Sequence, residues 1–282
     1  MAGTFNYLSR LIKNPRYALS SNFLLHPFSS INTARIITKC NLSLLDGVMK
    51  LTNCELPLLK SYLNDIENNL EFQKHIEQKF SEFIDFIKNS DMSKSKFSNE
   101  NPAGRLNRSS QGNAGYFLYL LVRAIKPNTI VETGVSSGES SAYLLQGLFD
   151  NNHGKLFSID LPPEYDQAKR NTVLLKDNLP GWIIPDYLRN RWELQLGPSQ
   201  DLLPPLLDKL GEIDMFWHDS LHTYDHMMFE YLESWKHLRE NGIIFSDDIA
   251  TLNKQGHSPI IDFAQLKNRD LVIYHLMGGL KK

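Results

Sequence analysis

Two short stretches of the sequence bring acids and histidines together at positions where they could bind a metal ion or move a proton. The first, WHDSLHTYDH, spans residues 217–226 and holds Asp219 among three histidines. The second, FSDDIA, contains the adjacent acids Asp247 and Asp248. Each follows a run of apolar residues typical of a strand, so the three acids fall at predicted strand ends.

Acids at buried strand ends lose hydration and repel each other, so they need a cation or a proton to coexist. Three carboxylates with open water positions favour a hard octahedral cation, above all Mg²⁺ or another divalent ion. We therefore predict a metal site at Asp219, Asp247 and Asp248. The alternative is that one acid caps the following segment and another is solvated.

The three histidines recur every four residues, which would place them on one face of a helix. The pattern instead predicts a strand that ends at Asp219 and a helix that begins near Tyr224. His218 and Asp219 then point to opposite sides of the sheet, and we expect His226 near the surface. A three-histidine zinc site is not expected, and Asp219 and His222 can both face a ligand crevice.

A glycine-containing turn follows another predicted strand, in ETGVSSGES (residues 132–140). Gly134 and Gly138 allow close approach to the backbone, and a helix start offers free N–H groups. The spacing is not the Gly-x-Gly-x-x-Gly of dinucleotide binders, which disfavours an oxidoreductase. Glu132 suits a cationic ligand group better than a pyrophosphate. The alternative is a turn that binds nothing.

Polar residues also end two further predicted strands. Asp160 stands where a doubly wound fold places a carboxylate on the ribose hydroxyls, although it could equally cap a helix. Ser199 and Gln200, in GPSQDLL, lie at a helix start within reach of an adenine edge. Helix capping by Ser199 is the alternative for that pair.

These positions require alternating strands and helices, and the sequence supplies them after residue 115. The predicted strands are Thr129–Thr133, Lys155–Asp160, Glu193–Leu196, Ile213–His218 and Gly242–Asp247. The predicted helices between them include Glu139–Phe149, Gln200–Leu210 and Tyr224–Arg239. This alternation predicts an α/β, Rossmann-like sheet, mostly parallel, with helices on both faces and ligands at the carboxyl ends of its strands.

The first part of the chain has a different character. An apolar stripe over Asn64–Asn89 predicts one helix, and a polar, turn-rich stretch follows it. We therefore expect a helical extension and linker over residues 1–108 and the α/β domain over 109–282. The extension could cover the crevice, form a homo-oligomer or select a substrate.

The composition of the chain limits the classes of partner and the cellular setting that can be expected for it. The net charge is −2, so no overall field attracts nucleic acid. Residues 1–45 hold five basic residues and no acid, so this segment could rest weakly on an anionic membrane surface, or simply be solvated helices. No apolar run is long enough for a membrane span and no signal peptide is recognisable. The spacing of Cys40 and Cys54 matches no metal or redox motif, and a reducing cytoplasm is expected.

Taken in order, E-T-G-x-x-x-G, a strand-end Asp, G-x-S-Q-D-L-L, D-x-x-H and D-D resemble class I S-adenosylmethionine-dependent O-methyltransferases of the metal-assisted type. The macrocin-type sugar O-methyltransferases and cephalosporin-hydroxylase-like proteins are nearer than catechol O-methyltransferase. The resemblance covers about residues 109–250 and implies methyl transfer to a hydroxyl of a small molecule or sugar. A metal-independent methyltransferase and a non-catalytic cofactor-binding protein are the alternatives.

The resemblance also implies a role for each motif. Asp160 would bind the ribose, His222 would be the general base, and Asp219 would serve catalysis as a metal ligand with Asp247 and Asp248. The methionine end of the cofactor would be held by Glu132, Gly134, Gly138 and Ser140, and the adenine bordered by Ser199 and Gln200. Residues 109–115, with Gln111 and Asn113, would lie beside the cofactor. One departure is the end of the chain, where one clear strand is predicted and a final strand is expected to be short or missing.

Overall fold

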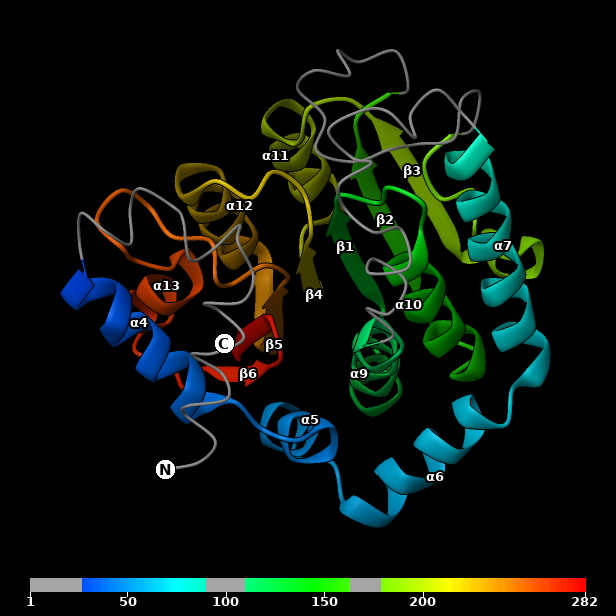
Figure 1. Cartoon of the computed structure of the whole chain (residues 1–282), viewed down its shortest axis with the longest axis horizontal. Helices are drawn as coiled ribbons and strands as arrows, with labels where there is room; N and C mark the ends of the chain where they lie inside the picture. Colours follow the sequence, from blue (N-terminus) through cyan, green and yellow to red (C-terminus); the bar gives the residue numbers. More distant parts are fainter. Residues whose placement is uncertain (1–26, 90–109, 163–178) are drawn as a thin grey trace. The chain divides into compact units, whose positions relative to one another are not determined.

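The computed structural model describes residues 27–89, 110–162 and 179–282. The chain divides into two compact units. One comprises Thr52–Pro198, and the other combines Met1–Leu51 with Ser199–Lys282. Each is described by itself, with the element labels of Figure 1.

The unit Thr52–Pro198 contains three parallel strands in the order β3-β2-β1 (Figure 1). They are β1 (Thr129–Thr133), β2 (Lys155–Asp160) and β3 (Trp192–Leu196). The predictions for β1 and β2 are confirmed at both ends, and β3 begins one residue earlier than predicted. The register pairs Thr133 with Ile159, so the residues after β1 and after β2 emerge at one edge.

The helices of this unit are α6 (Leu56–Glu67), α7 (Leu70–Asn89), α9 (Ser110–Ile125) and α10 (Glu139–Asp150), with a 3₁₀ helix η2 (Asp186–Arg191). The prediction of one helix over Asn64–Asn89 is wrong, because Asn68 and Asn69 interrupt it. The amide of Asn68 donates to the backbone of Asn64, and Asn69 Oδ1 accepts from the N–H of Phe72. Asparagine side chains compete in this way with helix hydrogen bonds, and the chain restarts as α7.

The other unit contains β4 (Ile213–His218), β5 (Leu238–Ser246), β6 (Val272–Tyr274) and β7 (Met277–Lys281), in the order β4-β5-β7-β6. β4 and β5 are parallel, whereas β7 is antiparallel to both β5 and β6. β4 has its predicted bounds, and β5 begins earlier than predicted.

The final strand, expected to be short or missing, is present as β7. Its sequence, MGGLK, does not predict a strand because glycine has low strand propensity. A side chain at Gly279 would come within 2.2 Å of the Phe245 ring, so β5 and β7 pair closely only because Gly279 has no Cβ. The tertiary contact overrides the local preference.

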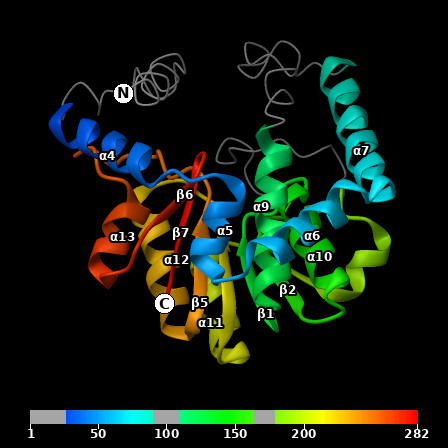
Figure 2. The ribbon, with the colours of Figure 1, turned by 90° about the horizontal axis from the view of Figure 1, so that it is seen from below.

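The helices of this unit are α4 (Pro27–Cys40), α11 (Ser199–Leu210), α12 (Tyr224–His237) and α13 (Pro259–Lys267), and α5 (Leu44–Thr52) ends at the unit boundary. Figure 2 shows α12 and α13 next to each other beside β5 and β7. Within the described ranges, no helix is both long and apolar enough to cross a bilayer. The predicted fold class is confirmed as α/β and Rossmann-like, and the described residues form seven strands that are mostly parallel. The predicted domain boundary after residue 108 falls outside the described residues.

Candidate active site

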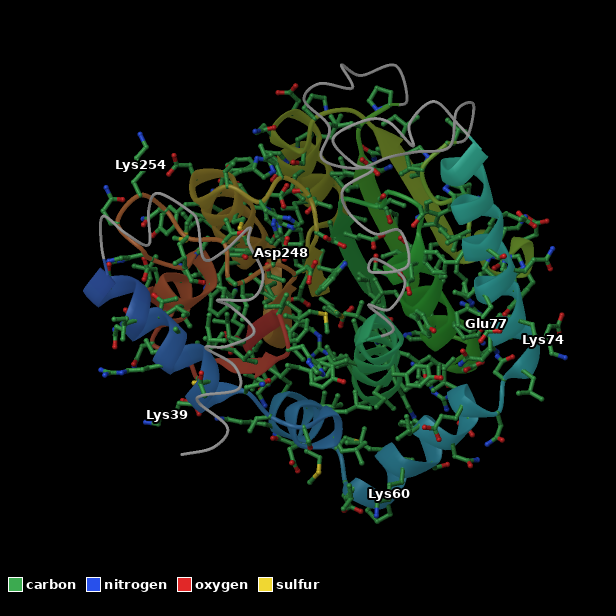
Figure 3. The ribbon with its side chains drawn as sticks, viewed as in Figure 1. Lys39, Lys60, Lys74, Glu77, Asp248 and Lys254 are labelled. Carbon is green, nitrogen blue, oxygen red and sulfur yellow. The ribbon has the colours of Figure 1, made fainter. Side chains whose placement is uncertain are left out.

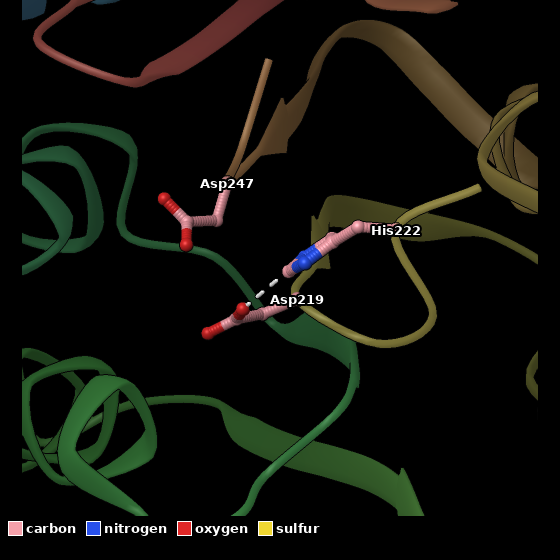
Figure 4. Close-up of side chains that lie close together, drawn as sticks. All are labelled: Asp219, His222 and Asp247. Atoms are coloured by element: carbon pink, nitrogen blue, oxygen red, sulfur yellow. Dashed lines mark ion pairs between the residues drawn. The ribbon is translucent and has the colours of Figure 1, made fainter. Parts of the chain in front are cut away.

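Asp219, His222 and Asp247 form a cluster in which one ligand atom of each lies within 4.8 Å of the others. Figure 4 shows the two carboxylates and the imidazole directed toward a common point. β4 and β5 are parallel neighbours, and their last residues, His218 and Ser246, pair with each other, so the acid that follows each strand lies at the same edge. The loop before α12 then returns His222 to the same place. We call these three residues the acid–histidine cluster.

Asp248 lies beside this cluster but on another side of the imidazole. Its Oδ2 is 3.2 Å from His222 Nδ1, whereas Nε2 of the same ring is 3.5 Å from Asp219 Oδ1. Asp248 has a left-handed backbone, with φ of 48°, which is uncommon for a residue other than glycine. Figure 3 labels Asp248 and also Lys254, whose side chain projects outward at the edge of the view. The structure thus groups Asp219, Asp247 and His222 most closely, and places Asp248 against the histidine.

The electrostatics of the cluster are unbalanced. Burial raises the pKa of Asp219 and that of Asp247, and neighbouring carboxylates raise both further. Burial lowers the pKa of His222, but Asp219 and Asp248 outweigh this and raise it to about 11. His222 Nε2 is buried without a hydrogen-bond partner, since 3.5 Å to Asp219 does not meet hydrogen-bond geometry. One imidazole therefore faces three acids, an arrangement that a divalent cation would complete.

The other two histidines of the 217–226 stretch are occupied elsewhere. Glu230, on α12, lies 2.6 Å from His218 Nδ1 and 2.8 Å from His226 Nε2. His226 is only 7% exposed, so the expectation that it lies near the surface is wrong. The imidazole rings of His218 and His226 both contact the buried carboxylate of Glu230. Because His218 lies on β4 and His226 on α12, the three histidines do not share one helical face, as predicted. Sequence reasoning did not single out Glu230; its spacing of four residues from His226 on a helix was the available signal.

The predicted glycine turn between β1 and α10 is present. Gly134 and Gly138 have φ of 84° and 94°, in the left-handed region that glycine tolerates. A Cβ on Gly138 would come within 2.6 Å of Gly181 Cα, so a backbone segment lies directly against it. The Gly181 N–H donates to Ser136 O at 2.9 Å. The segment that packs closely against Gly138 therefore belongs to the insertion between β2 and β3.

Glu132 is fully buried at the end of β1. Its carboxylate accepts hydrogen bonds from the hydroxyls of Ser140 (3.0 Å), Ser141 (2.7 Å) and Ser158 (2.7 Å). The Trp192 indole N–H donates in turn to Ser158 Oγ at 2.9 Å. The structure therefore brings Glu132 and Ser140 together and holds the carboxylate in one orientation.

Asp160, at the end of β2, binds the backbone of the glycine turn. Its Oδ2 accepts from the N–H groups of Val135 (3.1 Å) and Ser136 (2.7 Å), and its Oδ1 accepts from Leu161 (2.6 Å). Asp160 and the turn are thus neighbours, as expected if both contact one ligand. The structure also gives Asp160 a role that the sequence did not predict, since it fixes the conformation of the turn.

Ser199 and Gln200 begin α11, as predicted. The Ser199 hydroxyl donates to Glu230 Oε1 at 2.5 Å, and the Gln200 amide nitrogen lies 2.9 Å from His226 Nδ1. Both side chains therefore contact the network around Glu230, and Gln200 is also exposed.

The insertion between β2 and β3 packs against its own unit where it is described. Tyr187 donates to Gln146 at 2.6 Å, and the Trp192 ring contacts Gly181. His257, in the loop before α13, lies 3.2 Å from Asp262. The side chains of Gln111 and Asn113 are outside the described residues.

Comparison with known proteins adds one assignment. Residues 131–249, less than half of the chain, match a family described as a methyltransferase domain. No curated protein shows significant sequence similarity to the chain.

Solved structures with a related fold include three methyltransferases. The O-methyltransferase TomG from Streptomyces achromogenes, involved in tomaymycin synthesis and in complex with SAM, is 18% identical, with TM-score 0.45, over 60% of this chain and 79% of TomG. The O-methyltransferase from Bacillus cereus in complex with SAH is 16% identical, with TM-score 0.46, over 70% and 96%. SAH-bound PaMTH1 from Podospora anserina is 18% identical, with TM-score 0.44, over 72% and 94%.

These similarities are too low to argue from, so the assignment depends on the family match. The matched residues run from β1 to the segment after β5, and include the glycine turn, Asp160 and the acid–histidine cluster. Residues 131–249 therefore match a methyltransferase domain, and this match is what points to methyl transfer.

Proposed function

We propose that this protein transfers a methyl group from S-adenosylmethionine to a hydroxyl of a small molecule or sugar. A divalent cation, Mg²⁺ in the first instance, would bind at Asp219, Asp247 and Asp248, and His222 would be the general base. The observation that carries the proposal is the acid–histidine cluster, in which the loop after β4 and the residue after β5 bring three ligand atoms within 4.8 Å.

The residues of the cluster fit a hard cation. Carboxylate oxygens are the ligands that Mg²⁺ prefers, and imidazole is accepted by several other divalent ions. The raised pKa values of Asp219 and Asp247 mark a site where buried carboxylates are crowded together. A bound divalent cation would lower the pKa of an acceptor hydroxyl and restrict its orientation.

His222 can take a proton only while its ring is neutral. Beside Asp219 and Asp248 alone, its pKa is raised to about 11 and the ring is charged at neutral pH. Positive charge bound to these carboxylates would weaken their hold on the imidazolium and favour the neutral ring. In this proposal the cation and the base role of His222 therefore depend on each other, and the aligned ring accepts the hydroxyl proton.

The donor would be held by the residues at the ends of β1, β2 and β3. Glu132, fixed by three serine hydroxyls, suits the ammonium group of the methionine end, beside Gly134, Gly138 and Ser140. Asp160 would receive the ribose, and Ser199 and Gln200 would border the adenine. S-adenosylmethionine supplies a methyl group on a sulfonium, for which alignment with the nucleophile alone provides much of the rate.

The remaining expectations extend the proposal. The basic segment before residue 45 would make at most weak contact with anionic surfaces, and the helices before α9 would select the acceptor or form a homo-oligomer. Cys40 and Cys54 are free thiols, in keeping with the reducing cytoplasm that we propose as the setting.

The test is methyl transfer from labelled S-adenosylmethionine to a panel of sugars and catechols, with added Mg²⁺ or with excess chelator. We expect product that requires the metal. The Asp219→Asn variant should be inactive, whereas the matched Asp225→Asn variant, which changes an exposed acid six residues later, should retain activity. Full turnover in chelator would support a metal-independent methyltransferase. Cofactor binding without transfer to any acceptor would support a non-catalytic protein.

A further inference from the structure

One buried carboxylate outside the acid–histidine cluster joins three segments of the chain. Glu230 Oε1 accepts hydrogen bonds from Ser199 Oγ (2.5 Å) and Ser220 Oγ (3.0 Å), and lies 2.8 Å from His226 Nε2. Its Oε2 lies 2.6 Å from His218 Nδ1. Glu230 is 0% exposed. Four donors thus converge on two oxygens, which is about as many as a carboxylate can accept.

The first consequence concerns Asp219. This residue stands between His218 and Ser220 in the chain, and Glu230 contacts both. The side chain of His218 is fully buried toward Glu230, whereas that of Asp219 is 32% exposed, as expected for consecutive residues at a strand end. One carboxylate therefore holds the chain on each side of Asp219 and sets the direction in which Asp219 points.

The second consequence concerns the start of α11. Glu230 holds Ser199 directly and Gln200 through His226. The Gln200 amide nitrogen can only donate, so His226 Nδ1, 2.9 Å away, accepts. His226 Nε2 then carries the ring proton and donates it to Glu230. With this tautomer, both serine hydroxyls and both imidazole rings can donate to Glu230, which favours one rigid arrangement.

We propose that Glu230 is a positioning residue that serves both ligands of the enzyme. It orients Asp219 for the cation, and it orients Ser199 and Gln200, at the start of α11, for the cofactor. The inference depends on the proposed function, since it takes Asp219 as a cation ligand and Ser199 and Gln200 as cofactor contacts. Glu230 acts through these residues, because its own oxygens are already used by donors from the chain.

The test measures Kd values for Mn²⁺ and for S-adenosylhomocysteine by titration calorimetry on the full chain. Glu230→Gln keeps the size of the side chain but places an amide N–H₂ against hydrogen-bond donors. We expect both Kd values to rise by about 10- to 100-fold, the usual cost of losing a partner that orients metal ligands. The matched control is Glu233→Gln, on the same helix, where the carboxylate pairs with exposed Lys236 and both Kd values should stay unchanged.

Two smaller changes separate the two effects and decide the matter if Glu230→Gln does not fold. Ser199→Ala should weaken S-adenosylhomocysteine severalfold and leave Mn²⁺ unchanged, and Ser220→Ala should do the reverse. Melting curves confirm that each variant is folded at the temperature of the titration. Folded variants that bind both ligands as wild type does would overturn the inference. Wild-type protein that binds neither ligand would instead overturn the proposed function.

Discussion

The glycine turn with its flanking acids and the acid–histidine cluster are both polar sites at strand ends, but they differ in how their charges are satisfied. In the turn, Glu132 is held by three serine hydroxyls and Asp160 by three backbone N–H groups. In the cluster, Asp247 is buried, and the charges of Asp219 and Asp248 raise the pKa of its carboxyl further. The turn is thus complete by itself, whereas the cluster needs a positive ion.

This difference teaches what each site contributes. A carboxylate already fixed by hydrogen bonds loses little freedom when a ligand arrives, so the turn is suited to binding. A group of carboxylates that costs free energy while empty binds a cation strongly, because the ion relieves repulsion. Variants of the two sites should accordingly fail in different ways.

The largest effect is expected for Asp219→Asn. Loss of this charge should reduce kcat/KM by more than about 100-fold, beyond the cost of changing an outer partner of a metal ligand. The Kd of S-adenosylhomocysteine should stay within about twofold of the wild-type value, because Asp219 is not among the residues proposed to hold the cofactor. Calorimetry and initial rates measure the two quantities. Equal losses of cofactor affinity and turnover would show that the two sites are not separable.

The next effect is expected for His222→Gln. Loss of the proton acceptor should lower kcat by about 100-fold or more and leave the KM of the acceptor nearly unchanged. Rates are measured over a range of pH at saturating Mg²⁺, with His237→Gln, a histidine at the end of α12, as the control. A variant that keeps wild-type turnover at every pH would remove the base role from His222.

Gly138→Ala tests the rigidity of the turn. The left-handed backbone and the approach of Gly181 to 2.6 Å should together cost about 2–4 kcal/mol of unfolding free energy. Urea unfolding followed by circular dichroism measures the loss. Gly211→Ala is the control, since its φ is 75° but nothing lies within 4 Å of an added Cβ, so it reports backbone strain alone. If both variants lost the same unfolding free energy, the close contact with Gly181 would contribute nothing to the cost of the substitution.

The smallest effect is expected for Glu132→Gln. The three serines should still hold the side chain, so only the charge is lost, and the Kd of S-adenosylhomocysteine should rise about tenfold, or about 1.4 kcal/mol. The Kd of Mn²⁺ should not change. An unaltered cofactor Kd would mean that Glu132 is a structural acid within its serine network and not a ligand for the ammonium group.

Much of the fold could be predicted because apolar runs and turn residues report local structure directly. The bounds of β1, β2 and β4 follow from such runs. The prediction failed where a few residues acted against the local pattern. Asn68 and Asn69 interrupt an apolar stripe through side-chain hydrogen bonds. The glycines of β7 weaken the sequence signal for a strand, but Phe245 leaves no room for a side chain at Gly279.

For the site, the sequence by itself determined that acids and a histidine stand at strand ends, because strand periodicity places them there. Only the tertiary structure decided their partners. Asp248 lies 3.2 Å from His222, and α12 carries Glu230 to His218, His226 and the start of α11. Such contacts join residues from separate elements, and their geometry depends on backbone angles and packing that residue types and spacing do not encode.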